Sequence, residues 1–337
     1  MNTTYLVTGA SGHLGRTVAE ALLARDAEVR VLVLPKEVDT AHLPVGARVF
    51  AGDVRDPASL EPFFAVDAGT ALIVIHCAGI VTIASRFDPA VYDVNVRGTQ
   101  NIVDACIRHH VERLVYVSSV HALPTLPSGQ VQREIEHFDP ALVVGLYAQT
   151  KAEATAYVLL AARERGLNAV VVQPSGICGP NDYGNNHLTQ LVRDWHDGRL
   201  TAGIRGGYDF VDVRDVAAGI LAACERGRCG ECYLLTNRYV TVAEIFELLF
   251  DLTGRKRIRT FLPLWFIKTV APLAELYYRC LRQKPLFTTY SIYTLESNAE
   301  FSHEKAAREL GYKPRPLRVT LQDTLTWCQS VGLFRKG

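Results

Sequence analysis

Short, nearly continuous runs of aliphatic residues recur through the first half of the chain and predict strands. The runs are rich in Val, Ile and Leu and do not alternate with polar residues, so we expect strands that are buried on both faces. They occupy residues 5–8, 29–34, 47–50, 71–75, 113–118 and 168–173.

Helical patterns separate these runs at residues 14–25, 99–109 and 148–165, and Gly166 supplies a common stop signal after the last of them. Strands that alternate with helices predict an α/β protein with a doubly wound parallel sheet, the Rossmann architecture. We assign this domain to residues 1–175.

The rhythm changes after residue 173. Residues 174–186 are rich in Gly, Pro and Asn, which predicts a loop, and apolar runs at 208–213 and 232–235 are expected to return the chain to the sheet. From about residue 241 the pattern is mostly helical. The sequence therefore predicts a return to the Rossmann domain around residues 205–240 and a smaller, mostly helical substrate-binding lobe of residues 176–204 and 241–337.

A glycine-rich turn, Thr-Gly-Ala-Ser-Gly-His-Leu-Gly, follows the first predicted strand and opens the first predicted helix. Gly9 permits the tight turn, Gly12 lets the backbone approach a pyrophosphate, and Gly15 allows the helix to pack closely on the strand. A plain turn is the alternative, but the place directly after the first strand favours a dinucleotide site. The other expected cofactor contacts of this turn are Ser11, His13 and Leu14.

Tyr147 and Lys151 lie four residues apart in the third predicted helix and share one of its faces. An ammonium beside a phenol favours the phenolate and lowers its pKa, which makes Tyr147 a candidate proton carrier. Ser118 and Ser119 end a predicted strand, at the edge of the sheet where ligands bind. Each feature is common by itself, but their order along the chain makes them point together to one catalytic site.

With these motifs the chain resembles the extended short-chain dehydrogenase/reductase superfamily (the NAD-dependent epimerase/dehydratase family), and within it the dihydroflavonol reductase and 3β-hydroxysteroid dehydrogenase group. The resemblance covers nearly the whole chain. Beyond the motifs above it rests on Gly52-Asp53-Val54, His76-Cys77-Ala78-Gly79, Asn95-Val96-Arg97-Gly98-Thr99, Gln173-Pro174-Ser175-Gly176 and Phe210-Val211-Asp212-Val213.

The resemblance implies an NAD(P)-dependent oxidoreductase in which Tyr147 is the catalytic acid/base and also contacts the cofactor. It implies that Lys151 lowers the Tyr147 pKa and holds the nicotinamide ribose, and that Ser119 orients the substrate oxygen, with Ser118 as the second choice. It also implies three further sets of cofactor contacts. Asp53 and Val54 would contact the adenine, and Ala78 and Gly79 would pack beside the cofactor. Pro174, Ser175 and Gly176 would border the nicotinamide.

Lys36 favours NADP over NAD as the expected cofactor. NAD-preferring members carry an acid at the end of the second strand, where it binds the ribose hydroxyls. Here that strand ends Val33-Leu34-Pro35-Lys36, and a lysine at this place suits a 2′-phosphate. The alternative is a solvated Lys36, with Glu37 or Asp39 serving NAD.

Tyr208 bears on the substrate. Nucleotide-sugar epimerases of the superfamily usually carry an arginine before an Asp-Phe pair, whereas this chain has Tyr208 before Asp209 and Phe210. An aromatic residue suits a bulky apolar compound, so we expect a hydroxysteroid-like or dihydroflavonol-like alcohol or ketone, with His121 and Tyr208 lining its site. A nucleotide-sugar epimerase or reductase of the same fold and a non-catalytic NAD(P)-binding sensor stay as alternatives, although such sensors typically lack the Tyr/Lys pair.

Composition limits the binding partners and the cellular compartment that we expect for this protein. Among 337 residues, 36 Lys and Arg balance 35 Asp and Glu, so no excess of positive charge predicts nucleic-acid binding. The first residues lack a secretory pattern and the eight cysteines are scattered, so we expect reduced thiols in a cytoplasmic protein. Cys229 and Cys232 have CxxC spacing but no second pair, so we interpret them as packing thiols and expect no metal. A homodimer is the default assembly.

The apolar segment 261–281 raises the question of a membrane. Pro263, Lys268, Pro272 and Glu275 interrupt it, which argues against a spanning helix. Basic residues flank it, so contact with an anionic membrane surface through residues 255–284 is one interpretation. We favour the other interpretation, a helix that walls an apolar substrate pocket.

Overall fold

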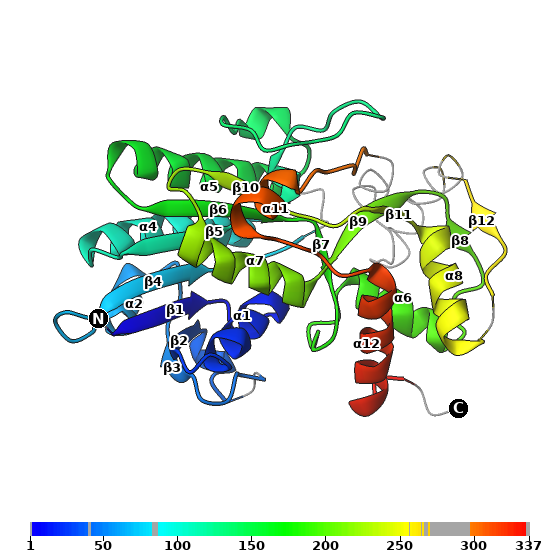
Figure 1. Cartoon of the computed structure of the whole chain (residues 1–337), viewed down its shortest axis with the longest axis horizontal. Helices are drawn as coiled ribbons and strands as arrows, with labels where there is room; N and C mark the ends of the chain where they lie inside the picture. The colour runs from blue at the N-terminus through cyan, green and yellow to red at the C-terminus, as the bar shows by residue number, and fades with distance from the viewer. Residues whose placement is uncertain are drawn as a thin grey trace.

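A seven-stranded parallel sheet forms the centre of the protein (Figure 1), with its strands in the order β10-β6-β5-β4-β1-β2-β3. The computed structural model describes residues 2–39, 42–82, 87–255, 257–263, 265, 269 and 297–334. The strands are β1 (Thr3–Thr8), β2 (Glu28–Val33), β3 (Arg48–Ala51), β4 (Ala71–His76), β5 (Arg113–Val117), β6 (Ala169–Pro174) and β10 (Cys232–Leu235).

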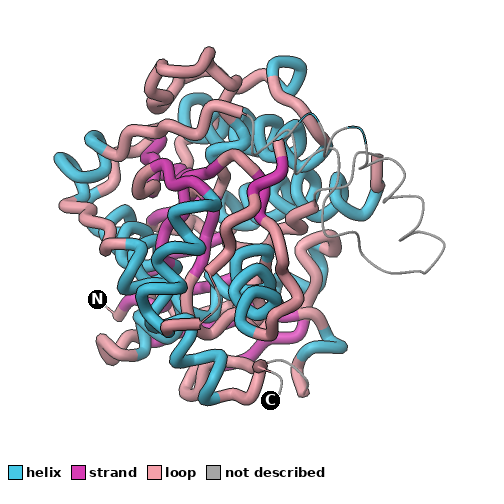
Figure 2. The backbone as a smooth tube through the Cα atoms, turned by 90° about the vertical axis from the view of Figure 1, so that its right-hand side faces the viewer, coloured by secondary structure: helices cyan, strands magenta, loops and turns pink. Residues whose placement is uncertain are grey.

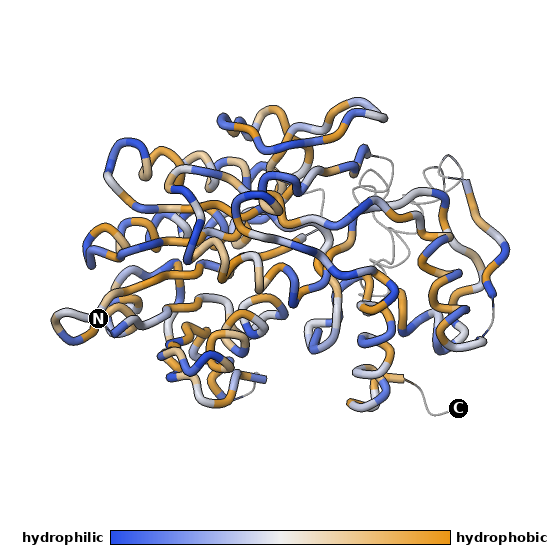
Figure 3. The backbone as a smooth tube through the Cα atoms, viewed as in Figure 1, coloured by the Kyte–Doolittle hydropathy of each residue, from blue (hydrophilic) through white to orange (hydrophobic). Residues whose placement is uncertain are grey.

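This sheet confirms the predicted Rossmann-type α/β fold, and the ends of its first six strands lie within two residues of the predicted runs. Buried residues alternate between two hydrophobic clusters: Leu6 and Leu114 belong to one, Val7 and Val115 to the other. Both faces of each strand are therefore covered, which explains the continuous apolar runs. Figure 3 shows the hydrophobic residues concentrated along these strands.

Helices cover both faces of the sheet (Figure 2). One face packs against α2 (Pro57–Phe64), α4 (Gly98–Arg108) and α5 (Leu146–Glu164). The other face packs against α1 (His13–Leu23), α7 (Val213–Arg226) and α11 (Glu304–Leu310). Single-turn elements complete this part: η1 (Pro35–Glu37), α3 (Pro89–Tyr92), η2 (Asp93–Arg97, π-helical), η3 (Val120–Ala122) and η4 (Pro140–Leu142).

A second, three-stranded sheet lies beyond the end of β6. It contains β7 (Gly176–Cys178), β9 (Gly207–Asp212) and β11 (Tyr239–Thr241), with β9 parallel to β7 and antiparallel to β11. The prediction that the run at 208–213 returns to the main sheet is therefore wrong. The position beside β6 belongs to β10, with Cys232 opposite Val171, so the run at 232–235 alone makes the predicted return.

Three helices pack together beside this second sheet, at the right of Figure 1: α6 (His187–His196), α8 (Val242–Thr253) and α12 (Leu317–Ser330). The short strands β8 (Gly203–Ile204) and β12 (Phe261–Leu262) pair next to them. The helix α11 packs instead on α7 and β10 of the main sheet. The division into a Rossmann domain and a substrate lobe stays a prediction.

Most of the segment 255–284, for which we weighed membrane contact, lies outside the described residues. Among the residues that the structure does describe, no helix has both the length and the apolar character needed to cross a membrane.

Candidate active site

Nearly all of the predicted site residues gather at one edge of the main sheet. The carboxyl ends of parallel strands meet at the same edge, and the predicted residues follow directly after these ends. The glycine turn follows β1, and Lys36 lies in η1 after β2. Asp53 and Val54 follow β3, Ala78 and Gly79 follow β4, and Ser119 follows β5. Pro174 ends β6, and Ser175 and Gly176 come directly after it.

The glycine turn has the geometry that a pyrophosphate requires. Gly9 takes a positive φ of 72°, and a Cβ on Gly15 would lie only 2.3 Å from the Gly9 carbonyl oxygen, so both positions require glycine. Gly12 caps α1 without a side-chain hydrogen bond, and the first turn of α1 holds no acidic residue. The N–H groups at this helix end can therefore face an anion, and the residues present fit a dinucleotide.

The neighbours of the glycines differ in their exposure. Ser11 is exposed on the turn, and Leu14 packs against one of the two core clusters. His13 Nε2 lies 2.8 Å from the carbonyl oxygen of Pro180, and burial lowers the pKa of this imidazole. His13 thus connects the glycine turn to the loop that follows β7.

The two predicted adenine contacts are held in different ways. Arg55 donates to both carboxylate oxygens of Asp53, at 2.6 to 3.0 Å, and these hydrogen bonds hold the pKa of Asp53 below its usual value. Val54 is buried against Gly98, and Asn101 donates to its carbonyl oxygen at 2.9 Å. Lys36 is exposed at the tip of the second strand.

A buried hydrogen-bond chain fixes the backbone after β4. His76 Nδ1 lies 2.7 Å from Thr8 Oγ1, and His76 Nε2 lies 3.2 Å from Thr99 Oγ1. Burial lowers the pKa of His76 to about 3, so the imidazole is neutral at physiological pH. Thr8 Oγ1 also accepts from the Ala78 N–H at 3.1 Å, which ties the end of β4 to the end of β1.

Lys151 projects from α5 into this edge of the sheet. Its side chain is buried, and its ammonium donates to the Val117 carbonyl oxygen at 2.8 Å and lies 4.9 Å from the centre of the Tyr116 ring. Burial lowers the pKa of Lys151 to about 8. A Cβ on Gly79 would lie 3.5 Å from the Lys151 Nζ, so the chain after β4 passes directly over the lysine.

Tyr147 lies one helical turn before Lys151 and is 8% exposed. Burial raises the pKa of Tyr147 to about 12, and a hydrogen bond with Ser119 acts in the opposite direction. The expected net lowering of this pKa by Lys151 is therefore wrong for this structure. Loss of hydration opposes the phenolate, and the ammonium is directed at the end of β5.

The two strand-end serines have separate partners. Ser118 is buried, and its Oγ lies 2.6 Å from Thr155 Oγ1 on α5. The Ser119 hydroxyl lowers the pKa of Tyr147, and its Oγ accepts from the His121 N–H at 3.2 Å. Of the two hydroxyls, that of Ser119 is the one that acts on the phenol, and its assignment to the substrate oxygen stays a prediction.

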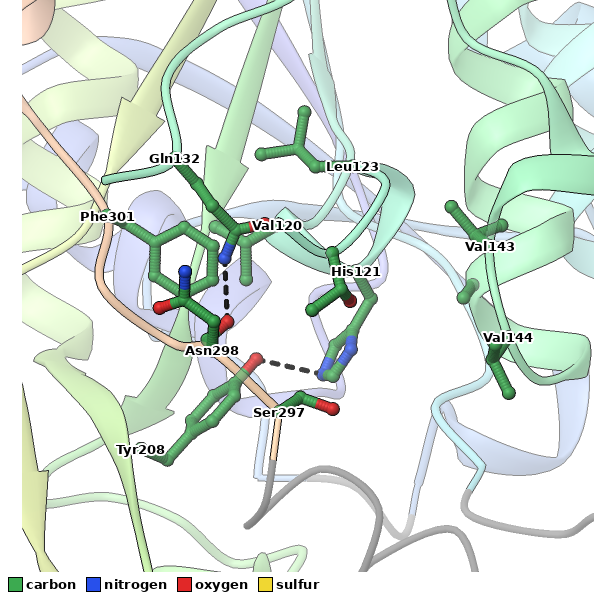
Figure 4. Close-up of a pocket in the computed structure, with 12 residues that line it drawn as sticks. Val120, His121, Leu123, Gln132, Val143, Val144, Tyr208, Ser297, Asn298 and Phe301 are labelled. Carbon is green, nitrogen blue, oxygen red and sulfur yellow. Dashed lines mark hydrogen bonds between the residues drawn. The ribbon is translucent and has the colours of Figure 1, made fainter. Parts of the chain in front are cut away.

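Val120 and Ala148, the chain neighbours of Ser119 and Tyr147, are among the residues that line a pocket, and Figure 4 shows its walls. His121 Nε2 lies 3.0 Å from the Tyr208 hydroxyl, the two rings stack at 5.7 Å, and His121 also lies edge-on to Tyr147 at 5.9 Å. Burial lowers the pKa of His121 to about 4. The remaining lining residues are Leu123, Thr125, Gln132, Val143, Val144, Ser297, Asn298 and Phe301.

Sequence reasoning missed part of this pocket. Gln132 donates to the Asn298 carbonyl oxygen at 2.7 Å, and Phe301 forms an isolated bridge with Gln132. These residues come from segments more than 160 positions apart, and neither segment carries a motif. The aromatic partner of Lys151, Tyr116, was equally hidden, because inside an apolar strand it resembles any core residue.

The two cysteines with CxxC spacing lie in different surroundings. Cys232 is buried in β10, and Cys229 is exposed with its thiol 3.5 Å from the Leu167 carbonyl oxygen. Within the described part of the chain, no group of three or more His, Cys, Asp or Glu side chains is arranged to hold a metal ion.

Comparisons with known proteins agree with this geometry. A family profile described as the NAD dependent epimerase/dehydratase family matches residues 5–235. Sterol demethylase protein B of Methylococcus capsulatus is 33% identical over 98% of this chain and all of its own. A 4-hydroxy-2-methyl-3-oxo-4-farnesyl-3,4-dihydroquinoline-1-oxide ketoreductase of Stigmatella aurantiaca is 31% identical over 98% of this chain and 97% of its own.

A solved structure, that of gox2253, has the same fold over 99% of this chain and all of its own, with a TM-score of 0.85 and 30% identity. The matched profile covers more than half of the chain and contains the glycine turn, Ser119, Tyr147 and Lys151. The chain belongs to the NAD-dependent epimerase/dehydratase family, the extended short-chain dehydrogenases/reductases, and is an NAD-dependent oxidoreductase of that type.

Proposed function

We propose that the protein interconverts a secondary alcohol and a ketone on a bulky, mainly apolar substrate of the hydroxysteroid or dihydroflavonol kind. The observation that carries this proposal is the group of side chains around His121, whose ring lies edge-on to Tyr147 at 5.9 Å and which lines a pocket together with Val120 and Ala148, the chain neighbours of Ser119 and Tyr147. The walls of this pocket combine aliphatic and aromatic side chains with polar ones, and Tyr208 and Phe301 lie on one side with Val143 on the other (Figure 4). The similarity to proteins named for a sterol and for a farnesylated quinoline supports an apolar substrate.

Tyr147 and Ser119 supply the proton chemistry. Reduction of a ketone needs a hydride at the carbonyl carbon, which a bound dihydronicotinamide provides, and a proton at the carbonyl oxygen. Tyr147 donates that proton, and Ser119 holds the same oxygen by a hydrogen bond. A pKa of about 12 keeps the Tyr147 hydroxyl protonated at neutral pH, so the residue is ready to act as an acid. In the oxidative direction the phenolate form of Tyr147 would receive the proton from the alcohol.

Lys151 would hold the nicotinamide ribose from below the loop of Ala78 and Gly79. Its ammonium is already fixed by the Val117 carbonyl oxygen, so little ordering remains when a ribose hydroxyl arrives. Gly12 and the first turn of α1 would hold the pyrophosphate.

We further propose that NADP is bound more tightly than NAD. Lys36 is exposed at the tip of the second strand, beside the expected 2′-position, and the residue directly before it is proline rather than an acid. The test is to measure dissociation constants for NADPH and NADH in the wild type and in Lys36→Ala. We expect NADPH binding to weaken about 10-fold or more in the variant, as for loss of one charged hydrogen bond, with NADH unchanged. A wild type that prefers NADH would overturn this preference.

The substrate is tested by following nicotinamide absorbance with a panel of hydroxysteroids, flavonoid ketones and nucleotide sugars. Turnover of apolar alcohols or ketones supports the proposal. Conversion restricted to uridine diphosphate sugars would replace it with the nucleotide-sugar alternative; it would be followed by product analysis as well as absorbance, because an epimerase regenerates its cofactor. A melting shift on addition of uridine diphosphate alone would give the same answer.

A further inference from the structure

Asp209 is a fully buried carboxylate that the proposed chemistry does not use. It lies on β9, directly after Tyr208. Its Oδ1 accepts from the Ser175 hydroxyl at 2.5 Å and from the Asn237 N–H at 3.0 Å. Its Oδ2 has no hydrogen-bond partner among the residues that the structure describes. A buried acid with one unsatisfied oxygen is costly, so a function is the natural explanation for its presence.

Ser175 lies in the passage of residues 174–176, where the chain leaves the cofactor edge of the main sheet and enters the second sheet. It separates the last residue of β6, Pro174, from the first residue of β7, Gly176. Gly176 pairs with Phe210 of β9, so β9 holds this passage through the backbone on one side and through Asp209 on the other. The residues of this passage are those expected to border the nicotinamide.

The surroundings of Asp209 favour an acceptor that works in both protonation states. Arg238 is the nearby cation that lowers its pKa, while burial raises that pKa to about 6. The thiol of Cys178 and the phenol of Tyr312 are the other titratable groups that interact with it. A proton on Oδ2 leaves Oδ1 free to accept from Ser175, so protonation does not break either hydrogen bond.

We propose that Asp209 is a positioning residue, which fixes Ser175 and with it the loop that borders the nicotinamide. Because β9 also carries Tyr208, the same strand sets the cofactor loop and one wall of the substrate pocket. This inference rests on the proposed function. The positioning role requires a hydrogen-bond acceptor at the place of Oδ1 but does not require a negative charge. An electrostatic role would require the charge.

The test compares Asp209→Asn with Asp209→Leu. The asparagine keeps an acceptor of the same shape, whereas the leucine leaves the Ser175 hydroxyl and the Asn237 N–H without a partner. We expect the dissociation constant for NADPH to change less than about 2-fold in Asp209→Asn and to rise about 10-fold in Asp209→Leu. Ser175→Ala should weaken NADPH binding to a similar extent, and the double variant Ser175→Ala/Asp209→Leu should be no weaker than either single variant. Rescue by asparagine together with this non-additivity is not expected of a residue that only stabilises the fold.

Each result has a definite consequence. Wild-type affinity in Asp209→Leu, or full additivity in the double variant, would overturn the positioning role. A large loss in Asp209→Asn would mean that the charge is required, which also overturns it. A wild type that binds neither NADPH nor NADH would instead refute the proposed function. If Asp209→Leu does not fold, Ser175→Ala decides, since unchanged NADPH binding in that variant contradicts the inference.

Discussion

The Lys151 ammonium donates a hydrogen bond of 2.8 Å to the carbonyl oxygen of Val117. This contact joins the helix that carries Tyr147 to the strand that delivers Ser119, so the three residues of the proposed site hold one another in place. The cost is a buried cation, whose pKa burial lowers from 10.5 to about 8.

Lys151→Met should make the protein more stable and less active. The lowered pKa corresponds to a penalty of about 3 kcal/mol for the buried charge at neutral pH, and the substitution removes this penalty. Loss of the hydrogen bond to Val117 destabilises the folded protein by about 1 kcal/mol. We therefore expect the free energy of unfolding to rise by about 2 kcal/mol while kcat/KM falls at least about 10²-fold. Denaturant unfolding and turnover measure the two effects, with Lys151→Arg as the control that keeps the cation.

The same substitution should change the response to alkali. Between pH 8 and 10.5 the unfolded wild type binds more protons at this lysine than the folded protein does. This difference makes wild-type stability rise with pH across that window, and Lys151→Met should lack this contribution. Equal slopes in the two proteins would show that the lysine is not buried as described.

Tyr147→Phe should remove the proton donor without disturbing the cofactor site. We expect kcat to fall by about 10²–10⁴-fold, while the dissociation constant for NADPH changes little. Ser119→Ala should also lower kcat, because it removes the hydroxyl that contacts the phenol. Its matched control is Ser118→Ala, since Ser118 pairs with Thr155 on α5 and should leave kcat near the wild-type value. A larger loss in Ser118→Ala than in Ser119→Ala would reverse the assignment.

Two alanine substitutions in the glycine turn should differ in kind. In Gly15→Ala the new Cβ would meet the Gly9 carbonyl oxygen at 2.3 Å, so we expect a lower melting temperature together with weaker NADPH binding. In Gly12→Ala the nearest atom is 3.3 Å away and φ is −86°, so the fold should tolerate the methyl group. Gly12→Ala should lose NADPH affinity alone, because the methyl occupies the approach of the pyrophosphate. Melting curves and binding titrations on both variants check this contrast.

His121 should contribute to loss of stability in acid. Burial lowers its pKa from 6.5 to about 4, so in that range the unfolded chain binds more protons than the folded protein. Stability then falls as the pH falls from 6.5 to 4, by up to about 1.4 kcal/mol per pH unit from this residue. Unfolding of His121→Gln at several pH values should show a shallower slope.

The sequence was sufficient to predict the main sheet and the edge at which the candidate site residues gather. Runs such as 71–75 are continuous because both faces of β4 are covered, and strand ends place Gly9, Ala78 and Ser119 together whatever the loops do. The error at 208–213 arose because an apolar run predicts a strand but not its neighbour. The competing strand, β10, decided the pairing.

The pKa of Tyr147 shows a second limit. Spacing on a helix places Lys151 on the same face, but it does not reveal how deeply the phenol is buried or which acceptor takes the ammonium. Both depend on the end of β5 and on the Ser119 turn, which are distant in sequence. The pocket residues Gln132 and Phe301 were hidden for the same reason.

Tyr208 and Asp209 are consecutive residues of β9, and consecutive strand residues point to opposite faces. One side chain reaches the pocket, and the other holds the passage beside the cofactor. Substrate preference can therefore diverge among descendants, or be redesigned, by exchange at position 208 while redox competence is inherited intact.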